Sequence, residues 1–154
     1  MDAPCGDLNW MQHVSLNGVR YIGGDIVSEL IDNNKRRFAQ KGLELLVLDI
    51  TKDNLPNVDA ILVRDCLVHF SYSDIHLFLQ NLKSSKIKYL ITTSFSNTWY
   101  NYNISSGNWR ALNLQKKPFS FPKPIHVIVE NCTDGYGQFP DKSLMIWEIQ
   151  NLPI

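Results

Sequence analysis

The chain has 154 residues, of which 44% are hydrophobic and 19% are charged. This composition is typical of one soluble globular domain, and no apolar run approaches the roughly 18 residues needed to span a bilayer. Fifteen basic and fifteen acidic residues cancel, so the charge gives no reason to expect binding to nucleic acid or to acidic lipid surfaces.

The cysteines and the N-terminus bear on the cellular compartment. Cys5, Cys66 and Cys132 lie far apart and show no paired metal-ligand spacing. We interpret them as reduced thiols and expect no metal site. No basic and apolar leader is recognisable at the N-terminus. These features favour a cytoplasmic protein.

The first half of the chain alternates strand and helix patterns. The predicted elements are a turn at residues 2–7, a short helix over 8–14, strands over 19–24, 43–50 and 59–65, and a helix over 26–40. The long helix has apolar residues three and four positions apart, whereas the strands are short apolar runs bounded by turn residues. The run over 43–50 suits a strand buried on both faces. This alternation predicts an α/β fold.

The second half adds one more helix and strand, a long irregular segment and a hairpin. The predicted elements are a helix over 74–83 that Ser73 caps, a strand over 87–95, a loop over 96–124, and antiparallel strands over 125–130 and 144–149. The loop contains three prolines and six aromatic residues. Because the aromatic content argues against disorder, we expect an ordered loop that covers another part of the molecule.

Several enzyme motifs are absent from the sequence. There is no glycine-rich loop ending in Gly-Lys-Ser or Gly-Lys-Thr, no Gly-x-Ser-x-Gly motif and no His-Glu-x-x-His motif. The Gly-x-Gly-x-x-Gly pattern of nicotinamide and flavin enzymes is incomplete, because Pro4 stands where the first glycine belongs and no third glycine follows. A nicotinamide-dependent oxidoreductase therefore remains only as an alternative.

Three acidic residues mark the predicted turns and strand ends. Asp2 begins a turn that contains Gly6, where the absence of a Cβ allows a tight bend beside a ligand. Asp25 follows the next strand, 25 − 6 = 19 residues after Gly6, and this position suits an acid that binds ribose hydroxyls. Asp49 ends the following strand. Asp25 is equally suited to cap the next helix, and Asp49 to begin a turn.

In this order, the glycine turn and the acidic strand ends resemble the class I S-adenosylmethionine-dependent methyltransferase family. The resemblance covers residues 2–149 and includes the terminal strand pair. It implies a three-layer, Rossmann-like α/β fold whose sheet is mostly parallel and closes with a C-terminal antiparallel hairpin. It also implies S-adenosylmethionine as the cofactor, and methyl transfer to a small-molecule or macromolecular acceptor that the sequence does not identify.

The resemblance assigns cofactor contacts to residues at the strand ends. They are Asp2, Pro4 and Gly6 for the methionine part, Asp25 for the ribose, Asp49 and Ile50 for the adenine, and Arg64 at the rim of the sheet. Pro4 departs from the family pattern, because proline replaces the usual glycine and removes an N–H that would otherwise bind the ligand.

The candidates for catalysis and substrate contact lie further along the chain. Asp65 is placed to face the cofactor amine or a substrate, and His69 is a suitable base because imidazole titrates near neutrality. An ion pair between Arg64 and Asp65, and a hydrogen-bonded histidine before a helix, are the structural alternatives. In the long loop, the candidates for substrate contact or a lid are Asn103, Trp109 and Arg110.

The glycine turn stands at the very start of the chain. In the methyltransferase family a central strand precedes this turn, whereas only Met1 precedes Asp2 here. Loss of a central strand leaves unpaired backbone groups on its neighbours. We therefore expect residues 1–154 to be one methyltransferase-like domain that is truncated at its N-terminus, binds S-adenosylmethionine weakly and has a sheet edge open to self-association. The alternative is a non-catalytic remnant that acts as an interaction module.

Overall fold

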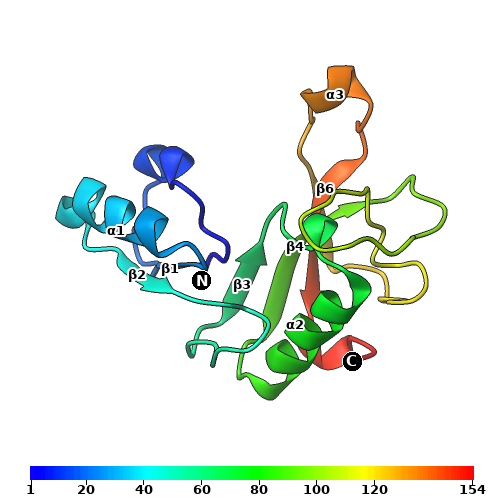
Figure 1. Cartoon of the computed structure of the whole chain (residues 1–154), viewed down its shortest axis with the longest axis horizontal. Coiled ribbons are helices and arrows are strands. Elements are labelled where there is room, and N and C mark those ends of the chain that lie inside the picture. The colour runs from blue at the N-terminus through cyan, green and yellow to red at the C-terminus, as the bar shows by residue number, and fades with distance from the viewer.

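The structure is a computed structural model that describes the whole chain apart from the side chain of Asp134. The strands are β1 (Ile22–Asp25), β2 (Glu44–Val47), β3 (Ala60–Val63), β4 (Tyr89–Phe95), β5 (His126–Val129) and β6 (Lys142–Glu148). The helices are α1 (Ser28–Arg37), α2 (Tyr72–Ser84) and α3 (Asp134–Gly137), with short 3₁₀ helices η1 (Asn9–His13), η2 (Ala39–Lys41), η3 (Leu67–His69) and η4 (Ile149–Asn151). Figure 1 shows these elements along the chain.

Residues 1–3 join two groups of strands into one sheet. β1 pairs in parallel with β2 and β3 with β4, while β6 runs antiparallel to both β4 and β5. Asp2 forms parallel bridges to Gly23 of β1 and to Leu62 of β3. The N–H of Asp2 donates to the carbonyl of Ile22 at 2.8 Å, and the N–H of Leu62 donates to the carbonyl of Met1 at 2.9 Å. The strand order is therefore β2, β1, residues 1–3, β3, β4, β6 and β5.

This order confirms the predicted mostly parallel sheet and its C-terminal antiparallel hairpin. The sequence left an empty position before the glycine turn, and residues 1–3 occupy that position with backbone hydrogen bonds on both sides. β1 and β3 therefore pair with residues 1–3, so the backbone groups that were expected to be unpaired form hydrogen bonds here. At the far edge of the sheet, all four residues of β5 are exposed. Self-association at a sheet edge stays a prediction.

The helices pack on both faces of the sheet. α1 connects β1 to β2 and α2 connects β3 to β4, in opposite directions from the centre of the sheet. Right-handed crossovers in opposite directions place two helices on opposite faces, and Figure 1 shows α2 lying across β3 and β4. The buried side chains form two separate clusters, one under each helix. Among the described residues no helix is both long and apolar enough to cross a membrane.

α2 follows its apolar pattern, but its start differs from the prediction. Ile75, Phe78, Leu79 and Leu82 form its buried stripe. The prediction that Ser73 caps the helix is wrong, because the Ser71 hydroxyl accepts the Asp74 N–H at 3.2 Å and Ser73 lies inside the first turn.

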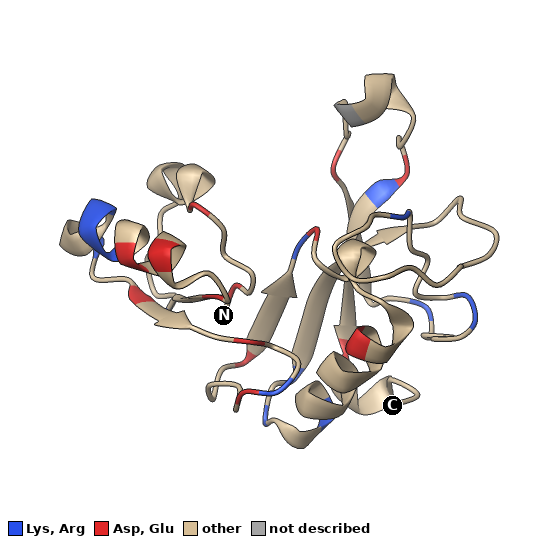
Figure 2. Ribbon diagram, viewed as in Figure 1, with Lys and Arg blue, Asp and Glu red and all other residues tan. Residues whose placement is uncertain are grey.

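α1 is shorter than predicted. It begins at Ser28, so Ile26 and Val27 precede it and are exposed rather than buried. Ile31 is its buried apolar residue. The last turn holds three cations, Lys35, Arg36 and Arg37, which Figure 2 shows at the end of the helix. Cations at this end complement the helix dipole.

β2 is an edge strand with exposed residues, so the prediction of a strand buried on both faces is wrong. Glu44 and Val47 are exposed, whereas Leu45 is buried. An apolar run predicts a fully buried strand only for a strand inside the sheet. β2 lies at the edge of the sheet, next to β1 alone.

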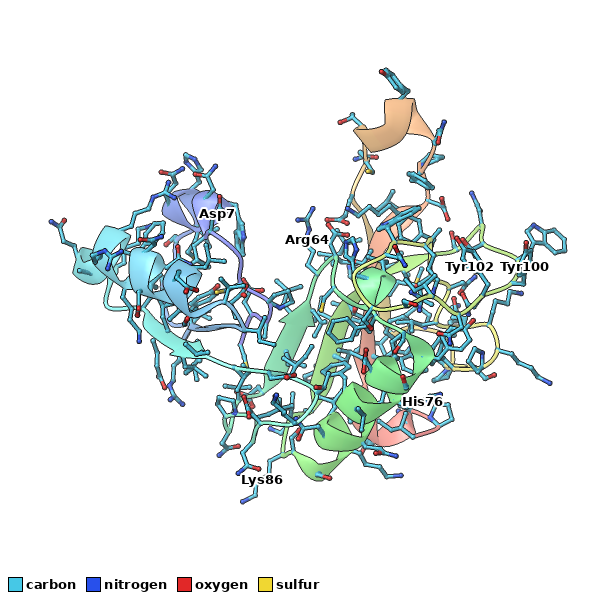
Figure 3. All side chains as sticks on the ribbon, in the orientation of Figure 1. Asp7, Arg64, His76, Lys86, Tyr100 and Tyr102 are labelled. Carbon is cyan, nitrogen blue, oxygen red and sulfur yellow. The ribbon has the colours of Figure 1, made fainter. Side chains whose placement is uncertain are left out.

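The loop over 96–124 packs over the chain, as expected. Four of its apolar side chains are buried in the cluster under α2: Leu112, Leu114, Phe119 and Phe121. The loop also covers the connection between β3 and α2, because the N–H of Gly107 donates to the His69 carbonyl at 2.9 Å. Figure 3 shows Tyr100 and Tyr102 pointing away from the body of the molecule, so part of the aromatic content stays exposed.

Candidate functional site

The loops that follow residues 1–3, β1, β2 and β3 enclose a cavity of about 200 Å³, called the first cavity below. It lies at the edge of the sheet where ligands of parallel α/β proteins bind. Its lining residues are Ala3, Pro4, Gly24, Asp25, Ile26, Leu48, Asp49, Ile50, Cys66 and Phe70. The lining is apolar apart from two carboxylates, which come from Asp25 and Asp49.

Asp25 holds the glycine turn in place. Its Oδ2 accepts the N–H of Gly6 at 3.1 Å, and its Oδ1 accepts the N–H of Val27 at 3.1 Å. The alternative in which Asp25 caps α1 is not realised, because Val27 is the N-cap residue and Asp25 binds the N–H of Val27 just before the helix. Each carboxylate oxygen has a second lone pair, so both remain able to accept a ligand hydroxyl. Asp25 thus connects the glycine turn, the end of β1 and the cavity.

The two glycines of this region are needed for different reasons. Gly6 has φ +57°, a left-handed conformation that glycine adopts without strain. Its carbonyl accepts the side-chain N–H of the buried Asn34 at 2.7 Å. A Cβ on Gly24 would lie 3.2 Å from the Leu48 Cδ2 atom. Glycine at this position therefore leaves space for the side chain of Leu48, which lines the first cavity.

Asp49 is held by the turn that it begins. Its Oδ1 accepts the N–H of Thr51 at 2.9 Å and the hydroxyl of Thr51 at 2.6 Å, and its Oδ2 lies 3.0 Å from Lys52 Nζ. Burial alone would raise the pKa of Asp49, but the Thr51 hydrogen bonds and the Lys52 ammonium together lower it. The carboxylate at this end of the cavity is thus kept ionised.

Asp2 lies beside the first cavity and does not line it. Its carboxylate is buried and accepts the Tyr21 hydroxyl at 2.7 Å. Burial raises the pKa of Asp2 from 3.8 to about 6, although the Tyr21 hydrogen bond and the N-terminal ammonium oppose the shift. The sequence predicted direct contact of Asp2 with the methionine part of a cofactor, and this contact stays a prediction because Asp2 does not line the first cavity.

Replacement of Asp2 by asparagine is expected to change how stability depends on pH. Because the folded-state pKa is raised above the unfolded value, Asp2 stabilises the fold most below pH 3.8, and this contribution is lost as pH rises through about 6. A shift of about two units corresponds to about 3 kcal/mol. Relative to the wild type, Asp2→Asn should therefore become more stable as pH rises. In urea titrations, the difference in unfolding free energy between the variant and the wild type should increase by about 2–3 kcal/mol from pH 4 to pH 7. Parallel pH curves would contradict this expectation, and Asp59→Asn, at an exposed carboxylate, is the control.

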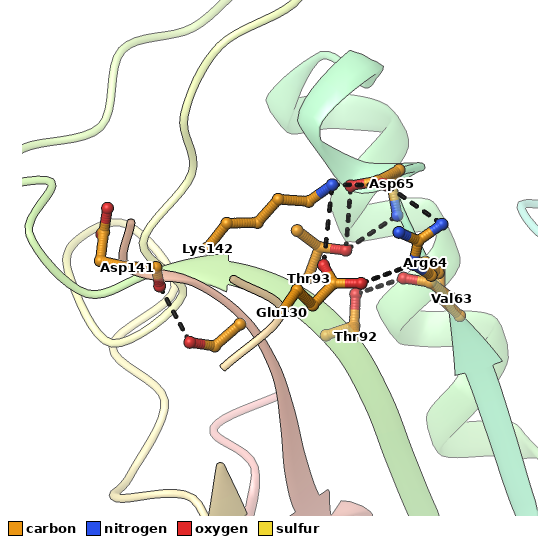
Figure 4. Close-up of polar contacts among 9 residues, drawn as sticks. Val63, Arg64, Asp65, Thr92, Thr93, Glu130, Asp141 and Lys142 are labelled. Carbon is orange, nitrogen blue, oxygen red and sulfur yellow. Dashed lines mark hydrogen bonds and ion pairs between the residues drawn. The ribbon is translucent and has the colours of Figure 1, made fainter. Parts of the chain in front are cut away.

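Arg64 does not line the first cavity. Its Nε donates to Glu130 Oε1 at 2.7 Å, and its Nη1 lies 3.6 Å from Asp65 Oδ2. Lys142 Nζ lies 2.8 Å from the same Asp65 oxygen, and Figure 4 shows these side chains as one network. The ion pair of Arg64 and Asp65, left open by the sequence, is thus present. The guanidinium of Arg64 is directed to the hairpin and Arg64 does not line the first cavity, so its predicted contact with the cofactor stays a prediction.

A second cavity, of about 350 Å³, lies beyond the segment that follows β3. Its lining residues are Asp65, His69, Phe95, Trp109, Cys132, Phe139 and Lys142. It brings together both catalytic candidates and one of the three substrate candidates. Asp65 has φ +51°, and its N–H donates to the Thr93 hydroxyl at 2.8 Å. A non-glycine residue in this conformation is strained, so the surrounding contacts fix its position.

The other two substrate candidates have structural roles. Asn103 Oδ1 accepts the N–H of Tyr72 at 2.7 Å and so satisfies a free donor at the start of α2. Arg110 is fully buried, its Nη1 donates to the Val68 carbonyl at 3.1 Å, and its guanidinium lies 5.5 Å from the Tyr72 ring centre. The prediction that Arg110 contacts a substrate is therefore wrong, because its side chain is closed off from solvent.

Several residues of the site escaped the sequence analysis. Asn34 binds the glycine turn, and its only signal is a polar residue on the buried stripe of α1. Phe139 and Lys142 reach the second cavity from the far end of the chain. Among the described residues, no group of three or more His, Cys, Asp or Glu side chains is arranged to hold a metal ion.

Comparison with known proteins gives matches to solved structures only, because no family model and no curated protein matches the chain. An S-adenosylmethionine-dependent methyltransferase from Clostridium acetobutylicum superposes with a TM-score of 0.63 and 13% identity, over 96% of this chain and 82% of that chain. PigF with SAH gives a TM-score of 0.65 and 11% identity, over 96% of this chain and 49% of that chain.

A third match is the O-methyltransferase from the trans-AT PKS multienzyme of Brevibacillus brevis in complex with S-adenosyl-L-homocysteine. It superposes with a TM-score of 0.54 and 20% identity, over 74% of this chain and 41% of that chain. The chain spans less than half of the length of several of these solved proteins. Together with the strand order and its antiparallel β6, these matches show that the chain has the class I S-adenosylmethionine-dependent methyltransferase fold.

Proposed function

We propose that the first cavity binds S-adenosylmethionine and that the protein transfers a methyl group from it to an acceptor. The observation that carries this proposal is that Asp25 and Asp49, from the ends of adjacent strands, line one apolar cavity. Two carboxylates separated by apolar walls suit a nucleoside, which has a polar ribose and a flat apolar base. The methyltransferase neighbours give independent support.

Several residues of the first cavity, and Gly6 in the turn beside it, have roles that their positions support. Asp25 accepts the ribose hydroxyls, Asp49 borders the adenine, and Ile50 packs against the base. Pro4 and Gly6, in the first turn, border the methionine part. When bound, the cofactor supplies a methyl group that is electrophilic because it is attached to a sulfonium. The chain orients the acceptor and, where needed, removes its proton.

Calorimetric titration of the 154-residue chain with S-adenosylhomocysteine tests this proposal. At a ligand concentration ten times Kd, binding should stabilise the fold by about 1.4 kcal/mol and raise the melting temperature by roughly 3–5 °C. Ile26→Ala should weaken binding about fivefold, because it removes part of the apolar wall. Val19→Ala is a matched control, because Val19 is 61% exposed, Ile26 is 62% exposed and only Ile26 lines the cavity.

Three outcomes would contradict the proposal. Absence of binding at millimolar S-adenosylhomocysteine would favour a non-catalytic module with a methyltransferase fold. Tighter binding of NAD than of S-adenosylhomocysteine in the same assay would favour a nicotinamide enzyme. Equal effects of Ile26→Ala and Val19→Ala would show that the ligand binds outside the first cavity.

A further inference from the structure

The two cavities share the short segment 65–70. Cys66 and Phe70 line the first cavity, whereas Asp65 and His69 line the second. Side chains of one short segment therefore form a wall of each cavity. A molecule in the second cavity lies across this segment from the proposed cofactor site. Methyl transfer requires the acceptor oxygen to reach the methyl carbon, so an acceptor held in the second cavity has to extend past this segment toward the first cavity.

We propose that the second cavity binds the methyl acceptor, that this acceptor is an uncharged planar aromatic compound with a hydroxyl group, and that His69 takes the hydroxyl proton. The proposal rests on the proposed function, which supplies the methyl donor. It adds the class of acceptor and the identity of the base.

The preference for a planar acceptor follows from the aromatic wall. The ring centres of Trp109 and Phe139 are 5.1 Å apart, and both rings pack edge-to-face with Phe95, at 6.0 and 5.6 Å. Trp109 remains 44% exposed, so part of its ring is available for a ligand. Aromatic side chains favour stacked or edge-to-face contact with another ring. At about 350 Å³, the cavity falls within the usual range for small-molecule sites.

The preference for an uncharged acceptor follows from the pairing of the nearby charges. Lys142 Nζ lies 2.8 Å from Asp65 and 3.6 Å from Glu130, and Arg64 pairs with Glu130. Burial alone would lower the pKa of Lys142, but the two carboxylates raise it, so the ammonium stays charged. Two cations and two carboxylates neutralise each other. No unpaired charge of this network is left to bind a charged ligand.

The role of His69 follows from its hydrogen bond to the long loop. Its Nδ1 lies 3.0 Å from the carbonyl oxygen of Asn108. A carbonyl only accepts, so Nδ1 is the donor in this contact, and in the neutral ring Nε2 then keeps its lone pair. The Gly107 N–H also binds the His69 carbonyl at 2.9 Å, so the loop fixes both backbone and ring. In the second cavity, Nε2 is the nitrogen left to accept a hydroxyl.

The transfer balances with these groups alone and a sulfonium methyl donor. Nε2 takes the hydroxyl proton, and the oxygen forms the new O–C bond to the methyl carbon. The C–S bond breaks and its electron pair stays on sulfur, which becomes a neutral thioether. The imidazolium then returns its proton to water.

Binding of three naphthalene probes tests the site without requiring catalysis. Calorimetry should show that 2-naphthol binds about tenfold more tightly than naphthalene, as expected for one good hydrogen bond, and that 2-naphthoate gains nothing. His69→Asn keeps a donor for Asn108 but lacks Nε2, so it should bind 2-naphthol only as well as naphthalene. His13→Asn, at an exposed histidine outside both cavities, should behave as the wild type. Trp109→Ala should weaken both naphthalene and 2-naphthol.

The outcomes separate this inference from the proposed function. If S-adenosylhomocysteine binds but 2-naphthol shows no advantage over naphthalene, the acceptor assignment is wrong and the cofactor site stands. If 2-naphthoate binds best, the cavity selects anions and the charge argument fails. If S-adenosylhomocysteine does not bind, the proposed function itself fails. His69→Asn and Trp109→Ala should leave S-adenosylhomocysteine binding unchanged, which also shows that these variants fold.

A kinetic measurement distinguishes a base from a residue that only shapes the cavity. With 2-naphthol as acceptor, His69→Asn should lower kcat about 100-fold, within the usual contribution of general base catalysis. With 4-nitrophenol, whose hydroxyl ionises far more readily, the loss should be much smaller because the acceptor needs little help to lose its proton. Equal losses for both acceptors would assign His69 a structural role.

Discussion

Replacement of Trp147 by alanine is expected to lower the free energy of unfolding by about 3–5 kcal/mol, the usual cost of deleting a large buried aromatic side chain. Trp147 is 1% exposed, and its ring packs edge-to-face on Phe121 with ring centres 5.3 Å apart. Its Nε1 donates to the carbonyl of Pro122 at 2.8 Å. The variant would therefore leave a cavity and an unpaired carbonyl, and would release the end of the long loop.

Chemical denaturation followed by circular dichroism measures this effect. Trp99→Ala is the matched control, because Trp99 lies in the long loop that Trp147 anchors but is 88% exposed, and its loss should change stability by less than about 0.5 kcal/mol. Trp147→Phe should keep most of the packing and lose the indole hydrogen bond, at a cost of about 1–2 kcal/mol. Similar stabilities for Trp147→Ala and Trp99→Ala would show that the loop does not depend on this anchor.

The second large effect is expected at Asp25. Asp25→Ala removes the acceptor for two backbone N–H groups, those of Gly6 and Val27. Hydrogen bonds to a charged group contribute about 1.5–3 kcal/mol each, so stability should fall by roughly 3 kcal/mol or more. Under the proposed function, the variant also loses the ribose contact, and its affinity for S-adenosylhomocysteine should fall at least about tenfold.

Calorimetry and denaturation on the same samples separate these two effects of Asp25→Ala. Asp59→Ala is the control, because its carboxylate forms only an exposed ion pair with Lys88, at 3.2 Å. Asp25→Asn retains one carbonyl oxygen and should fall between the wild type and Asp25→Ala in stability. A folded Asp25→Ala protein that binds S-adenosylhomocysteine as the wild type does would remove Asp25 from the ribose site.

The part of the site near the N-terminus could be predicted from the sequence. The spacing of Gly6 and Asp25 predicted a glycine turn and an acidic strand end at one ligand site, and the structure adds a hydrogen bond between these two residues. The place of Asp49 at the end of the next strand is correct as well, because strands alternating with helices bring their carboxyl ends to one edge. The proposed cofactor site depends here on local sequence features that the fold places in a regular way.

The residues of the long loop could not be predicted in the same way. Asn103 and Arg110 are polar residues between aromatic ones, which suggested substrate contact. Their partners, Tyr72 and Val68, lie 31 and 42 positions earlier in the chain, and nothing in the loop sequence reveals where it folds back. The same limit applies to β2, whose apolar run gives no information on its place at the edge of the sheet.

The segment 65–70, whose side chains line both cavities, has a thermodynamic consequence. If a ligand in the first cavity shifts Cys66 or Phe70, it also shifts Asp65 and His69, and so changes the affinity of the second cavity. Coupling between binding sites is reciprocal, so an acceptor must change the affinity for S-adenosylmethionine by the same factor. Cofactor and acceptor would then bind as thermodynamically linked ligands, with a coupling free energy set by six residues.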